Sequence, residues 1–430
     1  HYFYNIIILV MKMYINRTME NLLNELVDKY PVITITGPRQ VGKSTLLEYI
    51  AKTNKKEVTY ITLDDVFLRT AANEDPLLFL KNYNTPLIID EFQYAPNLLN
   101  YIKIIIDEAR KNALFENGPK ETLYYLTESQ IFESMENLSE SLAGRVAILD
   151  LYGFSTRELN KLEEDAFIPE INEIRKRKRL PNMTTEQLFE RIINGSYPEL
   201  NTNSNINREV FFRSYIRTYI ERDIRKLINV KDEAKFLKFI SCMAARTSEE
   251  YNASDLAKDI EVDPKTIDNW TSILVNTHLI YLLPPYSNND LKKIIKRPKI
   301  YFTDTGLAAF LAGYLDAQTL EKSAFSGSIF ETYVITEIIK SFASNGKDIR
   351  HRLFYYRDKD KKEIDLLIEY NNVVYPIGIK KSANPSKEAI KNFDVTKEFN
   401  KDIGTGIVLC MIREITPIDE HNYFVPIEYL

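Results

Sequence analysis

The strongest chemical signal in the sequence is "GPRQVGKST", residues 37–45. A glycine, four residues and then Gly-Lys-Ser is the spacing of a loop whose backbone N–H groups curl around phosphate oxygens. In this pattern Lys43 faces the β- and γ-phosphates, and the hydroxyl of Ser44 coordinates Mg²⁺. The sequence therefore predicts ATP binding by Gly37, Pro38, Arg39, Gln40, Val41, Gly42, Lys43, Ser44 and Thr45.

A pair of acids supplies the second half of a nucleotide site. Asp90 and Glu91 end the apolar run "TPLIIDEF", which is typical of a buried parallel strand. We expect Asp90, together with Ser44, to hold Mg²⁺, and Glu91 to polarise the attacking water. The cofactors predicted from these residues are ATP and magnesium.

Three further polar residues are candidates for work on the phosphate. Ser129 or Gln130, at the end of "LTESQ", would contact the γ-phosphate or the water, and capping of the strand end is the alternative. Arg145, before the strand-like run "VAILDLYGF", would be an arginine finger in cis or in trans. A solvated arginine is the alternative there.

These residues need a sheet that brings strand ends together. Strand-like runs separated by helical stretches predict a doubly wound α/β core at residues 11–155, with the ligand at the carboxyl ends of parallel strands. A glutamate directly after Asp90 indicates the division of these enzymes in which one extra strand separates the two strands that carry the motifs. The fold class predicted is a P-loop NTPase parallel sheet followed by three further regions.

The middle of the chain predicts helices and then a helix-turn-helix. Residues 156–230 form a helical lid or linker in this interpretation; its run "RKRKR" (175–179) is a solvated helix face or, alternatively, a phosphate-binding patch. Residues 231–305 have the pattern of a winged helix, with Ser254 capping one helix and Asp263 the next. Backbone contact with DNA, if any, is expected from the wing, at Lys292, Lys293, Lys296, Arg297 and Lys299.

The last third, residues 306–430, has a helix, a hairpin at Asn371-Asn372 and a helix, which resembles the layout of the PD-(D/E)XK nuclease-like fold. In that fold a helix glutamate, a strand aspartate and an E-x-K strand meet at divalent ions. The matching positions are Glu331, Asp365, Gly378 and Lys380. Because glycine stands where the pattern has glutamate, we interpret this as the remnant of a metal site and predict no nuclease activity.

Taken together, the chain from about Met11 to Leu430 resembles bacterial and archaeal AAA-type ATP-binding proteins that carry a C-terminal domain of unknown function with a nuclease-like fold. The resemblance is carried by phrases such as "ITGPRQVGKSTLL", "IIDEFQYAPNLL", "SYPEL", "IYFTDTGLAAFL" and "YPIGIKK". Glu128, Glu261 and Gly378 depart from it, since the family usually has glycine at the first two and glutamate at the third. A copy drifting under relaxed constraint is one hypothesis for these exchanges.

Composition narrows the setting. A net charge of -5, two cysteines and four histidines without ligand spacing favour a cytoplasmic protein without zinc and without a global nucleic-acid surface. Residues 1–10 are too short for a bilayer span and are expected to be upstream sequence. Two functions remain: an ATPase that couples nucleotide state to an adaptor and a nuclease-like module, or a nucleotide-gated scaffold that binds a protein or DNA partner. A homo-oligomer is compatible with both.

Overall fold

The computed structural model describes residues 14–53, 57–116, 122–129, 142–218, 233–287 and 297–430. The chain divides into two compact units. One comprises the chain up to Phe154 together with Ala343–Gly346, and the other comprises Ser155–Phe342 and Lys347–Leu430. Residues 1–10, Gln130 and the lysines at 292, 293 and 296 lie outside the described residues.

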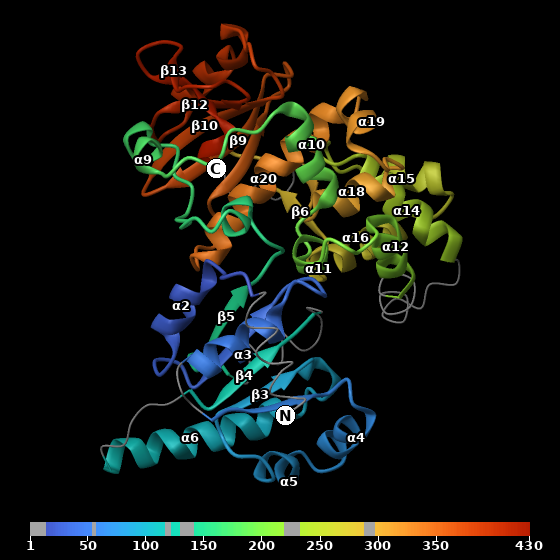
Figure 1. Ribbon diagram of the computed structural model, residues 1–430, viewed down its shortest axis with the longest axis vertical. Helices are drawn as coiled ribbons and strands as arrows, with labels where there is room; N and C mark the ends of the chain where they lie inside the picture. Colours follow the sequence, from blue (N-terminus) through green and yellow to red (C-terminus); the bar gives the residue numbers. More distant parts are fainter. Residues whose placement is uncertain (1–13, 54–56, 117–121, 130–141, 219–232, 288–296) are drawn as a thin grey trace. The chain divides into compact units, whose positions relative to one another are not determined.

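A five-stranded parallel sheet forms the centre of the first unit (Figure 1). Its strands are β1 (Val32–Thr36), β2 (Thr59–Thr62), β3 (Leu87–Asp90), β4 (Tyr124–Thr127) and β5 (Val146–Asp150), in the spatial order β2-β3-β4-β1-β5. Strand β4 lies between β1 and β3, so the expected extra strand between the two motif strands is confirmed. The apolar runs in these strands are continuous because helices cover the sheet.

The helices of this unit are α2 (Met19–Leu26), α3 (Lys43–Thr53), α4 (Val66–Glu74), α5 (Pro76–Lys81) and α6 (Leu98–Glu116). Capping residues mark where two of these helices begin. The Asp65 side chain accepts hydrogen bonds from the backbone at the start of α4, and Asp75 with Pro76 begins α5. One core cluster unites α5 and α6 with the sheet through Phe79, Leu80, Ile89, Ile102 and Leu126, among other residues.

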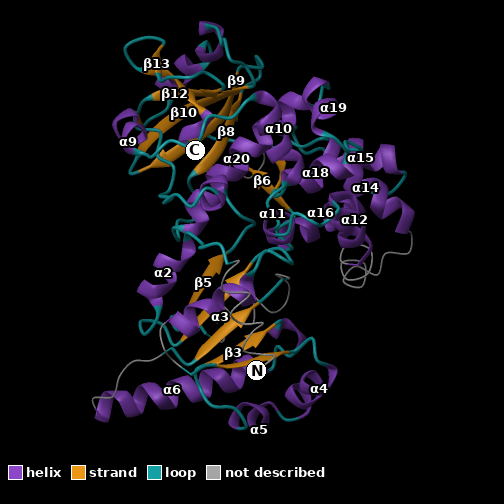
Figure 2. Ribbon diagram, viewed as in Figure 1, coloured by secondary structure: helices purple, strands orange, loops and turns teal. Residues whose placement is uncertain are grey.

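Helices dominate the first part of the second unit (Figure 2). They are α8 (Thr156–Leu159), α9 (Ile171–Lys176), α10 (Thr185–Asn194), α11 (Pro198–Thr202), α12 (Arg208–Tyr215), α14 (Glu233–Ala245), α15 (Ala253–Ile260), α16 (Pro264–Asn276), α18 (Thr305–Leu311) and α19 (Ala317–Lys322). Between α16 and α18, strands β6 (Ile280–Leu283) and β7 (Lys299–Phe302) pair in antiparallel fashion.

The predicted helix-turn-helix has the expected faces and one different cap. Asp263 caps α16 and Pro264 is its first residue, as predicted, and Trp270 packs inward while Asn269 is exposed. Asn252, not Ser254, caps α15, because its side-chain oxygen accepts from the N–H groups of the two residues after Ala253. Ser254 lies two positions beyond the cap, inside the helix, and donates its N–H to Asn252 instead.

The basic run at 175–179 is a solvated face in part: Arg175, Lys176 and Lys178 are exposed, whereas Arg177 and Arg179 are partly buried. The Arg177 guanidinium donates to the Tyr429 carbonyl (2.8 Å) and lies over the ring of Phe167. Arg179 pairs with Glu414 at 3.3 Å. Burial lowers the pKa of Arg177 to about 10. These arginines therefore hold the chain's last residues, which only the tertiary structure brings beside α9.

A mixed sheet follows the long helix α20 (Ser326–Ser344). Its strands are β8 (Leu353–Arg357), β9 (Glu363–Tyr370), β10 (Val373–Lys380), β11 (Asp402–Ile403), β12 (Gly406–Cys410), β13 (Thr416–Pro417) and β14 (Asn422–Pro426). Strands β8, β9 and β10 are antiparallel, and β10, β12 and β14 run parallel. The predicted hairpin is confirmed: Asn371 and Asn372 both have positive φ (51° and 66°), as a tight two-residue turn requires.

Candidate active site

The loop from Gly37 to Gly42 connects β1 to α3 and leaves the sheet at the carboxyl ends of its strands. Positive φ values at Gly37 (139°), Gln40 (62°) and Gly42 (92°) shape the loop. A Cβ at Gly37 would lie 2.0 Å from the Leu151 carbonyl oxygen, so the backbone reaches this position only as glycine. The loop thus begins with its backbone pressed against the end of β5.

Lys43 is buried at the first turn of α3 and is folded back on its own loop. Its ammonium group donates to the carbonyl oxygens of Gly37 (3.0 Å) and Pro38 (2.8 Å) and to the Ser129 hydroxyl (3.1 Å). Burial lowers the pKa of Lys43 to about 8, against the opposing effect of the Glu91 and Asp90 carboxylates. An anion such as a phosphate would restore the charged form.

Asp90, the last residue of β3, is held by three hydroxyl groups. Its Oδ1 accepts from Ser44 (2.5 Å) and Thr127 (2.5 Å), and its Oδ2 accepts from Tyr60 (2.9 Å). Ser44 and Asp90, predicted from separate motifs, are therefore adjacent. A hydroxyl beside a carboxylate is a donor set that suits Mg²⁺, so the residues present fit the ion that the motifs imply.

Glu91 has left-handed backbone geometry (φ 57°), which a glutamate rarely adopts. The conformation turns its side chain toward the neighbouring strand end, where Oε1 accepts from the Ser129 hydroxyl at 2.7 Å. Its Oε2 accepts from Gln93, and its N–H donates to the Thr127 hydroxyl at 3.0 Å. Ser129 consequently connects Lys43 with Glu91. The sequence predicted that these two residues serve one site, but it did not predict the hydroxyl that connects them.

Arg39 brings a second cation to the mouth of this site. Its Nη2 donates to the Tyr94 hydroxyl (2.9 Å), directly after the turn that carries Glu91. The Arg69 guanidinium lies 4.0 Å from the centre of the same tyrosine ring. Burial raises the pKa of Tyr94, and Arg39 opposes this effect. Arg39 is thus fixed on the Glu91 side of the loop.

Arg145 lies at the amino ends of the parallel strands, opposite the end that carries its own phosphate loop, and this placement gives no support to an action in cis. Val146 pairs with Val32 at the amino end of β1, whereas the phosphate loop follows Thr36 at the carboxyl end. At about 3.3 Å per residue, the length of β1 separates Arg145 from its own loop. Its guanidinium pairs instead with Asp107 of α6 at 2.7 Å. A role in trans stays a prediction.

Sequence reasoning missed several residues that complete the site. Thr127 contacts both acids, and Tyr60 and Gln93 hold one acid each. The position of Thr127 at the end of β4, two residues before Ser129, was a usable signal. Tyr60 gave none, because the register that brings β2 beside β3 is a tertiary property.

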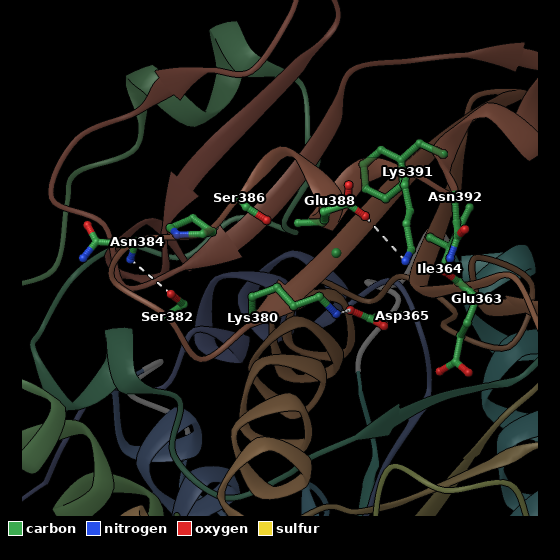
Figure 3. Close-up of a pocket in the computed structure, with 14 residues that line it drawn as sticks. Glu363, Ile364, Asp365, Lys380, Ser382, Asn384, Ser386, Glu388, Lys391 and Asn392 are labelled. Atoms are coloured by element: carbon green, nitrogen blue, oxygen red, sulfur yellow. Dashed lines mark hydrogen bonds and ion pairs between the residues drawn. The ribbon is translucent and has the colours of Figure 1, made fainter.

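The C-terminal candidates lie partly together. The Lys380 ammonium contacts Asp365 at 3.0 Å, as Figure 3 shows, and the register of β9 and β10 brings Gly378 opposite Asp365. Both line a cavity of about 490 Å³ with residues 382–393. Glu331 is engaged elsewhere, since Oε1 accepts from Tyr301 (2.6 Å) and Lys299 (3.2 Å). Lys299, expected on the wing surface, is buried, which corrects that prediction.

Comparison with known proteins agrees with the geometry of the first unit. Residues 29–160 match the model of an AAA domain, and the unit is a P-loop NTPase domain of the AAA type. Residues 185–318 and 326–430 match two domains of unknown function, DUF8612 and DUF4143.

Relatives cover most of the chain. It is 27% identical over 364 residues to the uncharacterized protein Rv2008c of Mycobacterium tuberculosis, covering 85% of this chain and 73% of the relative. It is 23% identical over 413 residues to the uncharacterized protein MJ1637 of Methanocaldococcus jannaschii, covering 88% and 82%.

Solved structures give weaker likenesses. The Walker-type ATPase PABY2304 of Pyrococcus abyssi matches with a TM-score of 0.41 at 13% identity, covering 68% of this chain and 94% of that one. The RuvB Holliday junction branch migration motor of Thermotoga maritima matches with a TM-score of 0.27 at 15% identity, covering 59% and 82%. Within the described residues, every helix falls short of the length and apolarity needed to cross a membrane.

Proposed function

We propose that the chain binds Mg-ATP at the loop of residues 37–45 and hydrolyses it. The observation that carries this proposal is the chain of contacts from Lys43 through Ser129 to Glu91, at 3.1 and 2.7 Å. It connects the group that would neutralise the γ-phosphate with the group that would act on the attacking water. Two functional side chains that share one hydroxyl are within the reach that general base catalysis needs.

The side chains have separate tasks in this proposal. Ser44 and Asp90 would hold Mg²⁺, which would supply positive charge to the phosphate oxygens. Lys43 leaves the carbonyls of Gly37 and Pro38 for the phosphate, which is a stronger acceptor because it is charged. Glu91 orients the attacking water and accepts its proton as the bond to ADP breaks. Ser129, released by Lys43, stays beside Glu91 and senses the phosphate.

The proposal is tested by separating binding from turnover. Lys43→Ala is expected to abolish tight ATP binding, because it removes the phosphate-facing charge. Glu91→Gln is expected to bind ATP and to lose turnover, by roughly a hundredfold or more if it acts as general base. Fluorescent ATP binding and phosphate release measure the two steps. Lys52→Ala on the exposed side of α3 and Glu74→Gln on α4 are matched controls. Unchanged turnover in Glu91→Gln would show that its assignment is wrong.

We further propose that nucleotide state is coupled to the second unit. There, α14 to α16 with the β6–β7 hairpin would form a winged helix, which their order along the chain supports. The mixed sheet with α20 would be the nuclease-like domain, on the support of the Asp365–Lys380 pair and the cavity beside it. DNA is one candidate partner: Arg297 is exposed at the hairpin, although Lys299 is not. The domain limits 11–155, 156–230, 231–305 and 306–430 stay part of this proposal.

A second candidate is a nucleotide-gated scaffold that holds ATP without rapid turnover and binds a protein or nucleic-acid partner. Glu128 favours it. This residue is buried between β4 and the site, and its carboxylate acts electrostatically on Lys43, so it adds negative charge where the phosphates would bind. Turnover stimulated by DNA favours the ATPase; slow turnover with tight retention of nucleotide favours the scaffold.

A further inference from the structure

A buried lysine lies among the acids of the C-terminal domain. Lys299 begins β7, outside that domain's sheet, and its side chain is 4% exposed. Its ammonium group contacts Glu363 of β9 at 2.6 Å and Glu331 of α20 at 3.2 Å. Three segments far apart in the sequence therefore meet at one positive charge.

A third carboxylate completes the centre. Asp365 lies two residues beyond Glu363 on β9, and its Oδ2 accepts from the Ile379 N–H (2.7 Å) and from Lys380 (3.0 Å). Figure 3 shows Lys380 directed at Asp365, while the Glu363 carboxylate points away from this pair. The Asp365 charge acts on both Lys299 and Glu331. Lys299 thus contacts two acids, Glu331 and Glu363, and the third, Asp365, acts on it electrostatically while it pairs with the more exposed Lys380.

Electrostatics keep Lys299 charged. Burial alone would lower its pKa, but Glu331, Glu363 and Asp365 together raise the pKa of Lys299 above its ordinary value. Burial raises the pKa of Glu331, and the Lys299 charge opposes that effect. Without this ammonium, Glu331 would keep a largely buried carboxylate and lose the cation that contacts it, which is an unfavourable arrangement.

We propose that the Lys299 ammonium is the resident cation of the centre formed by Glu331, Glu363 and Asp365, and that it excludes a divalent ion from this position. A metal bound by Glu331 and Glu363 would need oxygen ligands at about 2.0–2.6 Å and would lie within a few ångströms of the ammonium. Repulsion between the two cations then opposes its binding. Restoring a carboxylate at Gly378 would leave this obstacle in place.

The same contact has a structural role. Lys299 also lies 5.6 Å from the centre of the Tyr355 ring, and the Tyr355 hydroxyl donates to the Arg297 carbonyl. The β6–β7 hairpin is therefore joined to β8, β9 and α20 through the charge of Lys299. An ion that took this position would remove the contact of Lys299 with Glu331 and Glu363, and the backbone hydrogen bonds between Tyr286 and Tyr355 would remain. This inference is independent of ATP hydrolysis, because none of its residues belongs to the nucleotide site.

The test is Mn²⁺ binding to the full chain without nucleotide, measured by calorimetry and by electron paramagnetic resonance. Lys299→Met keeps the length of the side chain and removes its charge. We expect it to bind one Mn²⁺ at least tenfold more tightly than the unaltered protein, because Glu331 and Glu363 lose the cation that they share. Adding Glu331→Gln to this variant should abolish the gain and so locate the ion.

Lys340→Met is the matched control, since Lys340 is similarly buried and pairs with Glu337 at 2.8 Å, outside the group of Glu331, Glu363 and Asp365. It should lose stability and gain no Mn²⁺ site. If Lys299→Met folds only with Mn²⁺ present, the ion has replaced the ammonium and the proposal stands. A folded Lys299→Met with no gain, a variant that Mn²⁺ fails to refold, or an equally tight site in the unaltered protein that Glu331→Gln abolishes would each overturn it.

Discussion

Lys43 shows how burial sets the protonation of one residue. Its pKa of about 8 in the free site reflects lost hydration, and a phosphate partner must raise that value again. ATP affinity should therefore be greatest below pH 8 and fall as the pH rises through this value. Between pH 8 and 9, where free Lys43 is largely neutral, binding should take up a proton.

Calorimetry at pH 8.5 in two buffers of different ionisation enthalpy measures this proton. A difference between the apparent enthalpies in the two buffers is the expected result. Lys43→Arg is the control, because a guanidinium stays charged at this pH and its binding should take up none. Identical enthalpies for the unaltered protein would contradict the proposed protonation change.

Glu128 provides a second prediction for a single residue. Its buried carboxylate repels the phosphates, so Glu128→Gln should tighten ATP binding severalfold while the side chain keeps its size. Fluorescence titration with a labelled ATP measures the affinity. Glu48→Gln on α3, where the carboxylate is half-buried and paired with Lys52, serves for comparison and should change it little. Weaker binding in Glu128→Gln would mean that the carboxylate organises the loop.

At the scale of elements, the turn between α15 and α16 is strained by its residue type. Glu261 ends α15 in the left-handed region (φ 61°, ψ 52°), where glycine is the usual residue. Glu261→Gly should raise the free energy of unfolding by about 0.5–1 kcal/mol, because the Cβ clash disappears. Lys258→Gly, in the exposed interior of α15, should lower it by about 1 kcal/mol. Urea denaturation followed by circular dichroism distinguishes the two signs; loss of stability in both variants would contradict the argument.

The β9–β10 hairpin shows why an element was easier to predict than its use. Two asparagines with positive φ close the turn, and alternation then places Asp365 and Gly378 on facing strands. A Cβ at Gly378 would meet the Ala389 carbonyl oxygen and a Val408 methyl at 3.4 Å, so a larger residue fits with little adjustment. The hairpin therefore has room for a Cβ at residue 378 without a change in its backbone.

At the scale of the whole molecule, the position of Arg145 at the amino ends of the strands favours action on a nucleotide bound by another copy of the chain. If it does so, a mixture of Arg145→Ala and Lys43→Ala proteins should regain turnover, since an intact Arg145 of one then faces an intact Lys43 of the other. Specific activity of the unaltered protein should also rise with its concentration. Arg110→Ala, a neighbouring surface arginine on α6, is the control. Turnover independent of concentration, without rescue in the mixture, would leave the Asp107 ion pair as the role of Arg145.

The sequence by itself determined the nucleotide-binding loop, the acid pair, the parallel sheet with its extra strand and the tight hairpin. These features depend on local spacing and on the alternation or continuity of apolar residues, which are properties of short segments. Of the two helix caps predicted, Asp263 is confirmed, and Ser254 is wrong because Asn252, two residues earlier, caps α15.

Only the tertiary structure decided where the charged side chains lie in the folded protein. Lys299 and Arg177 looked like surface cations in the sequence, yet one is buried among acids and the other holds the chain's last residues. Arg145 lies at the amino ends of the strands, away from its own phosphate loop, because strand direction and register decide at which end of a sheet a residue lies. The position of a long charged side chain depends on the groups that folding brings close to it, and those groups are far away in the sequence.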